Sequence, residues 1–297
     1  LWRLLGQPWD VIDLHEEPFA LATAEVLLLR ELRRVPTPYC LYSAQNIDKR
    51  YPPPFRWLEQ WALRHATAVS VCNAEAGEIV ARKGLTGKAA LIGLGVDPEQ
   101  FAPGPERPPS SDGAVTVGYV GRLAPHKGVD VLLEAVAAEP RLHLVVAGAG
   151  PQASQLQARA RQSDLAARVD LIGAVDKSDL PDLYRSLDVL AVPSLTTPGW
   201  VEQFGRVAVE AMACGTPVVA SDSGALPDVV RGAGLLVPPG DAAALAEALA
   251  RAGTDERLSA TMRREGIARA REFSWDRIGE TYVELYESMS TRCLLYT

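Results

Sequence analysis

The chain has 297 residues, of which 47% are hydrophobic and 23% charged, and its formal net charge is −7 at pH 7. This composition is typical of a globular protein with enough apolar residues for a large core. The acidic net charge argues against nucleic acid as a partner, because binding driven by overall charge would require a basic protein. The four cysteines lie far apart and lack metal-ligand spacing, so we expect no disulfide framework, no metal and a cytoplasmic location.

Strand-like and helix-like segments alternate from the start of the chain. The predicted strands are 11–14, 39–43, 68–71 and 89–92, and the predicted helices are 19–34, 55–65 and 74–83. Alternation with crossovers of this length predicts a parallel α/β sheet. The chain has no initiator methionine and reaches a strand almost at once, so we expect it to be a fragment of a longer protein.

A second alternation follows a proline-rich segment. Residues 98–113 carry five prolines and no periodicity, which predicts a linker. The strands predicted after it are 115–120, 142–147, 169–172, 189–192, 217–220 and 235–237. The predicted division is an N-terminal domain at 1–105, a linker at 106–113, a C-terminal domain at 114–272, a final helix at 273–290 and a tail at 291–297. The tail breaks the helical pattern, and we expect it not to be native sequence.

Two glutamates flank the start of a predicted helix in the second domain. Glu202 precedes Phe204 and Gly205, and Glu210 lies in the second turn of the helix at 206–214. A helix that opens after glycine presents unpaired N–H groups to an anion, and carboxylates accept hydrogen bonds from sugar hydroxyls. The alternative is a buried loop-to-helix junction with two surface glutamates.

Two cations lie five residues apart after the first strand of the second domain. Gly121 and Arg122 follow that strand, and Lys127 comes where the next helix, 127–138, is predicted to open. Arginine binds phosphate oxygens with a fork of donors and lysine with a point charge. The alternative is a solvated loop, with His126 as a solvated neighbour.

These segments follow different strands of one predicted sheet. In open α/β sheets ligands bind beyond the carboxyl ends of the strands, so Arg122, Lys127, Glu202 and Glu210 should share one edge. Val175, after the strand at 169–172, offers a backbone platform for a base. The combination favours a sugar-nucleotide ligand.

Three sequence motifs resemble those of the retaining glycosyltransferases of family 4. They are GRLAPHKG, EQFGRVAVEAMACGTPVVAS and SGALPDVV, within a resemblance that runs from about residue 10 to residue 288. The resemblance implies the GT-B fold, with two Rossmann-like doubly wound domains facing across a cleft. It also implies transfer of a sugar, with retained configuration, from a nucleotide diphosphate to an unidentified acceptor.

The resemblance assigns a role to each motif residue. Arg122 and Lys127 would hold the donor diphosphate, Glu202 the sugar hydroxyls and Glu210 the ribose. The wider donor site comprises Gly121, Val175, Phe204, Gly205, Arg206 and Val207, the last four through N–H groups at the helix start. The donor would be a co-substrate and no metal would be needed, because cations and the helix end stabilise the leaving diphosphate.

Several alternatives stay open at this point. The family's first βα units are missing before residue 1, so the N-terminal domain would be incomplete and the chain could be a non-catalytic binding fragment; an epimerase on the same fold is the other alternative. His15, Gln45 and Asn46 are N-terminal candidates for the acceptor side. The arginines at 30, 33 and 34 would form a solvated helix face or touch anionic lipid at a membrane. Nothing in the sequence predicts an oligomeric state.

Overall fold

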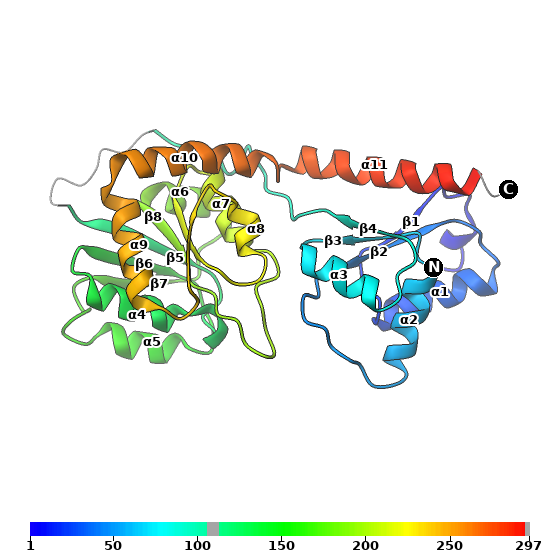
Figure 1. Ribbon diagram of the computed structural model, residues 1–297, viewed down its shortest axis with the longest axis horizontal. Helices are drawn as coiled ribbons and strands as arrows, with labels where there is room; N and C mark the ends of the chain where they lie inside the picture. The colour runs from blue at the N-terminus through cyan, green and yellow to red at the C-terminus, as the bar shows by residue number, and fades with distance from the viewer. Residues whose placement is uncertain (106–112, 295–297) are drawn as a thin grey trace. The chain divides into compact units, whose positions relative to one another are not determined.

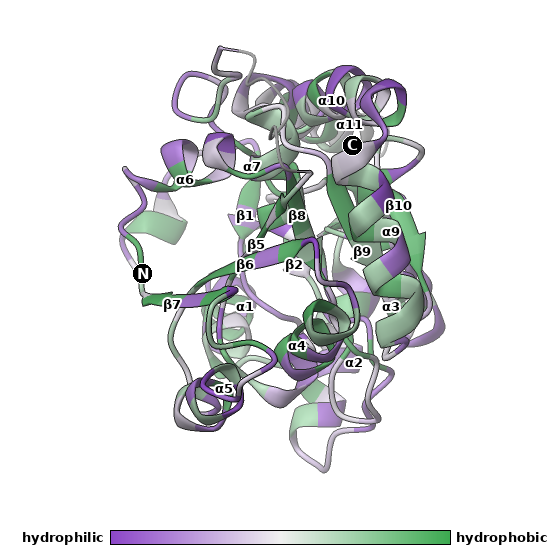
Figure 2. Cartoon of the chain, turned by 90° about the vertical axis from the view of Figure 1, so that its left-hand side faces the viewer, coloured by the Kyte–Doolittle hydropathy of each residue, from purple (hydrophilic) through white to green (hydrophobic). Residues whose placement is uncertain are grey.

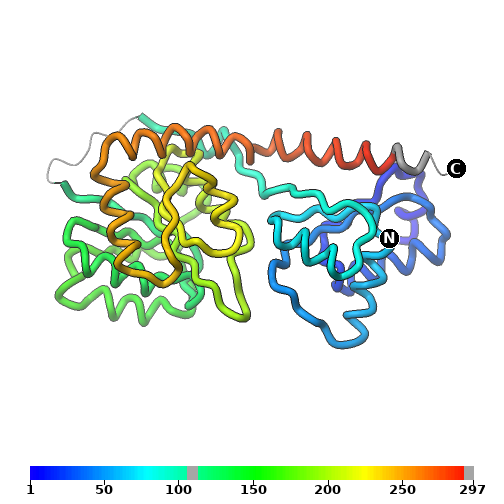
Figure 3. Tube along the Cα trace, viewed as in Figure 1, coloured from blue at the N-terminus to red at the C-terminus, as the bar shows by residue number. Residues whose placement is uncertain are grey.

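The described part of the chain forms two compact units. The computed structural model describes residues 1–105 and 113–294, with side chains as far as residue 290. The first unit is Leu1–Leu94 with Asp276–Thr297, and the second is Gly95–Trp275. Figure 3 shows the chain passing from the first unit into the second and returning through its last helix. The predicted linker at 106–113 lies, apart from Gly113, outside the described residues.

The first unit is a parallel four-stranded sheet with the order β1-β2-β3-β4. Its elements are η1 (Leu4–Gly6), β1 (Ile12–Leu14), α1 (Leu21–Leu32), β2 (Tyr39–Ser43), α2 (Phe55–His65), β3 (Ala68–Val71), α3 (Ala74–Arg82), β4 (Lys88–Leu91) and α11 (Trp275–Leu294). Alternate residues of β2 face opposite sides, as the two-residue period of a strand requires. Tyr39 and Leu41 pack with α1, α2 and α3, while Cys40 packs with Ile278 and Leu285 of α11.

The second unit is a parallel six-stranded sheet with the order β10-β9-β8-β5-β6-β7. Its strands are β5 (Val115–Val120), β6 (Leu142–Ala147), β7 (Val169–Gly173), β8 (Val189–Val192), β9 (Val218–Ser221) and β10 (Leu235–Val237). Its helices are η2 (Pro125–Lys127), α4 (Val129–Ala138), α5 (Ala153–Ala160), α6 (Leu180–Ser186), α7 (Arg206–Ala213), α8 (Leu226–Val230), α9 (Ala242–Thr254) and α10 (Glu256–Arg271). The two parallel sheets confirm the predicted α/β class with two Rossmann-like domains.

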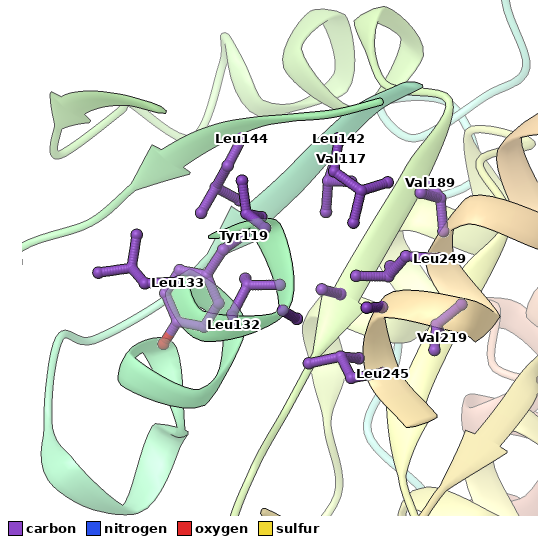
Figure 4. Packing of buried hydrophobic residues seen from close by; sticks show 14 of the residues in the cluster. Val117, Tyr119, Leu132, Leu133, Leu142, Leu144, Val189, Val219, Leu245 and Leu249 are labelled. Carbon is purple, nitrogen blue, oxygen red and sulfur yellow. The ribbon is translucent and has the colours of Figure 1, made fainter. Parts of the chain in front are cut away.

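The core of the second unit lies between its sheet and the helices α4, α5 and α9. Figure 4 shows Val117 and Leu144 from the sheet beside Leu132 of α4 and Leu249 of α9. On the opposite face, α7 packs against β8 and β9 and also contacts α6 and α10 (Figure 1). Both faces of the sheet are therefore covered, which explains why every residue of β8 and β9 is buried and why all of them except Ser221 are hydrophobic (Figure 2).

Two helix starts carry the side-chain caps that the sequence predicts. The N–H of Ala76 donates to Asn73 at 2.8 Å, and the N–H of Ala244 donates to Asp241 at 2.9 Å. The last helix, α11, extends to Leu294, beyond the predicted end near Met289 and into the predicted tail. Among the described residues, no helix combines the length and apolar content that a bilayer crossing requires.

Candidate functional site

The strand order of the second unit reverses between β5 and β8. From β5 the chain runs outward to β6 and β7, whereas β8, β9 and β10 build the sheet in the other direction. Ligands of open α/β sheets bind beyond the carboxyl ends of the strands at such a reversal. The segment after β5 contains Lys127, and the segment after β8 contains Glu202.

Lys127 and Glu202 meet at this point. The Lys127 Nζ donates to Oε2 of Glu202 at 2.7 Å, and the Ser194 hydroxyl donates to the same oxygen at 2.7 Å. The side chains of Lys127 and Glu202 are 23% and 11% exposed, so the ion pair is largely shielded from water. The two residues lie 75 positions apart in the chain, and the fold alone brings them together.

Gly128 allows the segment after β5 to pack closely against the segment after β8. Its φ is +68°, and a Cβ there would lie 2.0 Å from the carbonyl oxygen of Pro193. The N–H of Leu195 also donates to the carbonyl oxygen of His126 at 2.8 Å. Lys127 therefore belongs to the short helix η2, and α4 begins only after Gly128, whereas the sequence predicted one helix from residue 127.

Replacement of Gly128 by alanine should destabilise the protein by about 1–3 kcal/mol, because it adds left-handed strain to a steric clash. Thermal unfolding of Gly128→Ala measures the effect. The matched control is Gly199→Ala in the segment after β8, where an added Cβ meets nothing within 4 Å. A Gly128→Ala protein as stable as this control would show that the close approach of the two segments is dispensable.

Helix α7 opens beside this pair at Gly205. Gly205 has φ +89°, and a Cβ there would lie 2.5 Å from Cδ2 of Leu226. Phe204 is buried with its ring edge-on to Phe273, at 5.4 Å between centroids. The side chain of Phe204 thus serves the core, and only its backbone remains a candidate for ligand contact. Arg206 is exposed and Val207 half-buried in the first turn of the helix.

Glu210 is buried in α7 and bonded to a residue of another helix. The Tyr184 hydroxyl of α6 donates to Oε2 of Glu210 at 2.8 Å, and Nε of Arg206 lies 3.6 Å from Oε1. Burial raises the pKa of Glu210 above its ordinary value, against the opposing effects of Tyr184 and Arg206. Burial, followed by the charge of Glu210, raises the pKa of Tyr184.

The remaining predicted residues lie at the carboxyl ends of β5 and β7. Gly121 follows β5, and the carbonyl oxygen of Arg122 accepts from the Tyr119 hydroxyl at 2.9 Å while the Arg122 side chain is exposed. Burial, then the charge of Lys127, lowers the pKa of His126, and Arg122 contributes to this shift. Val175 lies half-buried just beyond β7. Within the described residues, no three His, Cys, Asp or Glu side chains gather in a metal-binding group.

Four neighbours of the site were not predicted as partners. They are Tyr184 on Glu210, Ser194 on Glu202, and Trp200 with His126 beside Lys127. Ser194 could have been predicted as a neighbour of Glu202, because it directly follows Pro193, where the segment leading to Glu202 begins. Tyr184 carries no such signal, because an aromatic residue in a helix is typical of a core.

Two solved structures have this fold. Sucrose-phosphate synthase from Thermosynechococcus elongatus has a TM-score of 0.75 at 26% identity, over 96% of this chain and 74% of that one. Anabaena HepE in complex with UDP has a TM-score of 0.79 at 24% identity, over 94% of this chain and 79% of that one. The fold is therefore the GT-B architecture of glycosyltransferases.

Family models cover both units. The model of glycosyl transferases group 1 matches residues 105–269, and that of a glycosyl transferase 4-like domain matches residues 1–95. D-inositol 3-phosphate glycosyltransferase of Corynebacterium jeikeium is 31% identical, over 96% of this chain and 73% of that protein. The enzyme of the same name from Corynebacterium urealyticum is 32% identical, over 97% of this chain and 74% of that protein. The chain belongs to the group 1 glycosyltransferases, as its motifs predicted, and is an enzyme of that class.

Proposed function

We propose that this glycosyltransferase transfers a sugar, with retention of configuration, from a nucleotide diphosphate to a hydroxyl of an acceptor. The observation that carries the proposal is the contact of Lys127 with Glu202 at the reversal of the strand order. It places a cation for phosphate beside a carboxylate for sugar hydroxyls, which are the two chemistries that meet where a sugar joins its diphosphate. The complex of HepE with UDP supports a nucleotide donor.

The donor would lie along the carboxyl edge of the second sheet. Lys127 and Arg122 would bind the diphosphate, together with N–H groups of residues 204–207 at the start of α7. Glu202 would accept hydrogen bonds from the sugar, and Glu210 from the ribose. The base would contact the backbone near Val175, and Gly121 would let the backbone approach the ligand.

The chemistry assigned to these residues is stabilisation of a leaving group. The bond from the anomeric carbon to the diphosphate breaks, and the acceptor oxygen bonds to that carbon on the same face. The acceptor's proton passes to the departing phosphate oxygen. Lys127 and Arg122 stabilise the negative charge that develops on the diphosphate, so the reaction as proposed needs no metal. The family resemblance supports the retaining course.

A screen of nucleotide sugars by thermal shift is the experiment that tests the function. A donor that binds the folded state must raise the Tm, and transfer is then assayed with candidate acceptors. Inositol 3-phosphate is the first probe, because the two curated relatives carry its name. Transfer to any acceptor supports the proposal. A nucleotide sugar interconverted without acceptor indicates an epimerase, and binding without turnover indicates a non-catalytic binding protein; either result contradicts the proposal.

We propose that the enzyme acts in the cytoplasm and that Arg30 does not bind membrane lipid. Among the described residues, Cys40, Cys72 and Cys214 are buried and not part of a disulfide bond, as is common in a reducing compartment. Arg30 donates to the carbonyl oxygen of Thr37 through Nε at 3.1 Å and Nη2 at 2.9 Å, so its charge is engaged within the first unit.

Donor binding should depend on pH through Glu210. As a carboxylate Glu210 accepts from ribose, so UDP affinity should be full at neutral pH and fall several-fold as the pH drops through a midpoint above 4.5. The effect on folding has the opposite sign. A folded-state pKa above the unfolded value contributes stability that is present at low pH and lost as the pH rises through the folded value.

Calorimetric titration with UDP between about pH 5 and pH 8 measures this dependence. Glu210→Gln is the control, because it cannot ionise and the phosphates of UDP titrate equally in both proteins. Identical pH profiles for the two proteins would exclude Glu210 as the titrating group.

A further inference from the structure

The segment between β8 and α7 carries an indole ring next to Lys127. Thr197 and Trp200 form a two-residue hairpin, with the N–H of Thr197 donating to Trp200 at 2.9 Å and the reverse bond at 3.2 Å. Nζ of Lys127 lies 4.5 Å from the centroid of the Trp200 ring, and the ring of His126 contacts the same ring in a tilted arrangement, with 4.2 Å between centroids and 32° between planes. The last two residues of η2, His126 and Lys127, therefore contact one aromatic side chain.

From this arrangement we infer that Trp200 is a positioning residue that holds the ammonium group of Lys127 where the donor diphosphate arrives. Lysine is a point charge on a flexible four-carbon stem, so its direction must be set by its neighbours. Here the carboxylate of Glu202 and the ring of Trp200 set it together. The inference rests on the proposed function, because it concerns the same diphosphate site.

The hairpin itself is fixed to the sheet edge. The hydroxyls of Thr196 and Ser223 are hydrogen-bonded at 2.7 Å, and Ser223 follows β9. On the other side, Leu195 is bonded through its N–H to the carbonyl oxygen of His126. The ring is thus held by segments after two different strands, and its position does not depend on the tip residues Pro198 and Gly199, which are exposed.

An aromatic ring suits this task better than a second carboxylate would. The ring attracts a cation through its quadrupole and brings no net charge, so Lys127 keeps its charge for a diphosphate. Because Lys127 is already paired with Glu202, a further carboxylate would make this cluster net negative and repel the incoming phosphates. When the diphosphate binds the ammonium group of Lys127, the ion pair between Lys127 and Glu202 breaks. The carboxylate oxygens of Glu202 then become available to the hydroxyls of the sugar.

The neighbouring histidine is consistent with this interpretation. Burial and then the charge of Lys127 lower the pKa of His126, so the imidazole remains neutral at physiological pH. A neutral imidazole can pack against Trp200 without acting as a second cation on the indole ring. The two rings therefore lie against each other next to Lys127, and the imidazole adds no charge there.

A double-mutant cycle on UDP binding tests the inference. We expect Trp200→Ala to weaken UDP binding by about 5-fold and Trp200→Phe by about 2-fold, since phenylalanine offers a weaker π face at the same position. In a Lys127→Met background, Trp200→Ala should change the affinity by less than about 1.5-fold, because the group that the ring positions is absent. Trp57→Ala, at a side chain 64% exposed in the first unit, is the control and should leave UDP binding unchanged.

Three outcomes would contradict the inference that Trp200 positions Lys127. If Trp200→Ala weakens UDP equally with and without Lys127, the ring acts on the ligand directly or only supports the fold, and the inference is wrong. A Trp200→Phe protein as weak as Trp200→Ala overturns it as well, provided that its Tm matches the wild type. If Lys127→Met alone leaves UDP affinity unchanged, the proposed diphosphate site is wrong and the inference falls with it.

Discussion

Lys127→Met should lower the rate of sugar transfer by about 10²- to 10³-fold, which is the usual effect of removing one preorganised donor to a developing anion. The methionine keeps most of the volume of the lysine stem and removes the charge. The loss should appear mainly in kcat, because the charge on the diphosphate grows as its bond to the sugar breaks. Steady-state kinetics with the donor identified by the screen measure both constants.

Two controls accompany this variant. Lys88→Met replaces an exposed lysine of β4 in the first unit and should transfer sugar at the wild-type rate. Unfolding temperatures are compared as well, because Lys127→Met leaves the largely buried Glu202 without its cation. A folded Lys127→Met enzyme with wild-type kcat would remove Lys127 from the diphosphate site.

Glu210→Ala should weaken donor binding by about 10- to 100-fold, as expected when a buried charged acceptor of hydrogen bonds is deleted. Glu210 is only 7% exposed, and the hydrogen bond from the Tyr184 hydroxyl fixes the orientation of its carboxylate. Ribose would therefore bind to an acceptor that is already oriented. Glu210→Gln retains one carbonyl acceptor and should lose less. Calorimetry with UDP gives the affinities, and Glu78→Ala at an exposed helix position of the first unit is the control.

The stability of the same variants separates binding from folding. Glu210→Ala leaves the buried Tyr184 hydroxyl without its acceptor, which costs about 1–3 kcal/mol. Adding Tyr184→Phe should recover part of this stability and none of the UDP affinity. Recovery of affinity in the double variant would mean that Glu210 supports the fold and does not touch the donor.

The sequence predicted the strands well because each strand of the second unit is a short apolar run between turn residues. It failed at the start of α4, where the apolar pattern from Val129 onward was extended back to Lys127 although the backbone of Gly128 is left-handed. Helix periodicity reports which face is buried and does not report such a local break. Lys127 was consequently predicted in α4, whereas it lies in η2.

The division of the chain into units shows a similar limit. Prolines placed the end of the first domain at residue 105, but the second unit begins at Gly95. Residues beyond 95 are bonded to the second unit, since Arg185 donates to the carbonyl oxygen of Ala102 at 2.9 Å and Val96 donates to Phe273 at 2.7 Å. Such bonds between distant residues have no signature in local composition.

The proximity of candidate site residues was predictable where a motif and a strand end coincide. Lys127 and Glu202 each follow a strand, and topology dictates that they are neighbours at the reversal between β5 and β8. The contact of Trp200 with Lys127 could not be predicted, because the position of Trp200 depends on the conformation of a hairpin. His126 was predicted as solvated, whereas its ring packs against Trp200, a partner that the local sequence does not show.

The segment that contains the Trp200 hairpin has fixed ends and an exposed tip. Before the hairpin, Thr196 is tied to Ser223, and after it the carbonyl oxygen of Glu202 accepts from the N–H of Ala225 at 3.0 Å. Both ends are closed by bonds to the sheet edge, and doubling the length of a flexible loop costs only about 0.6 kcal/mol. Insertions between Pro198 and Gly199 should therefore be tolerated while Glu202 keeps its place. The tip of the hairpin is the part of this segment that can change in length, whereas Trp200, which contacts Lys127, is the part that cannot be exchanged.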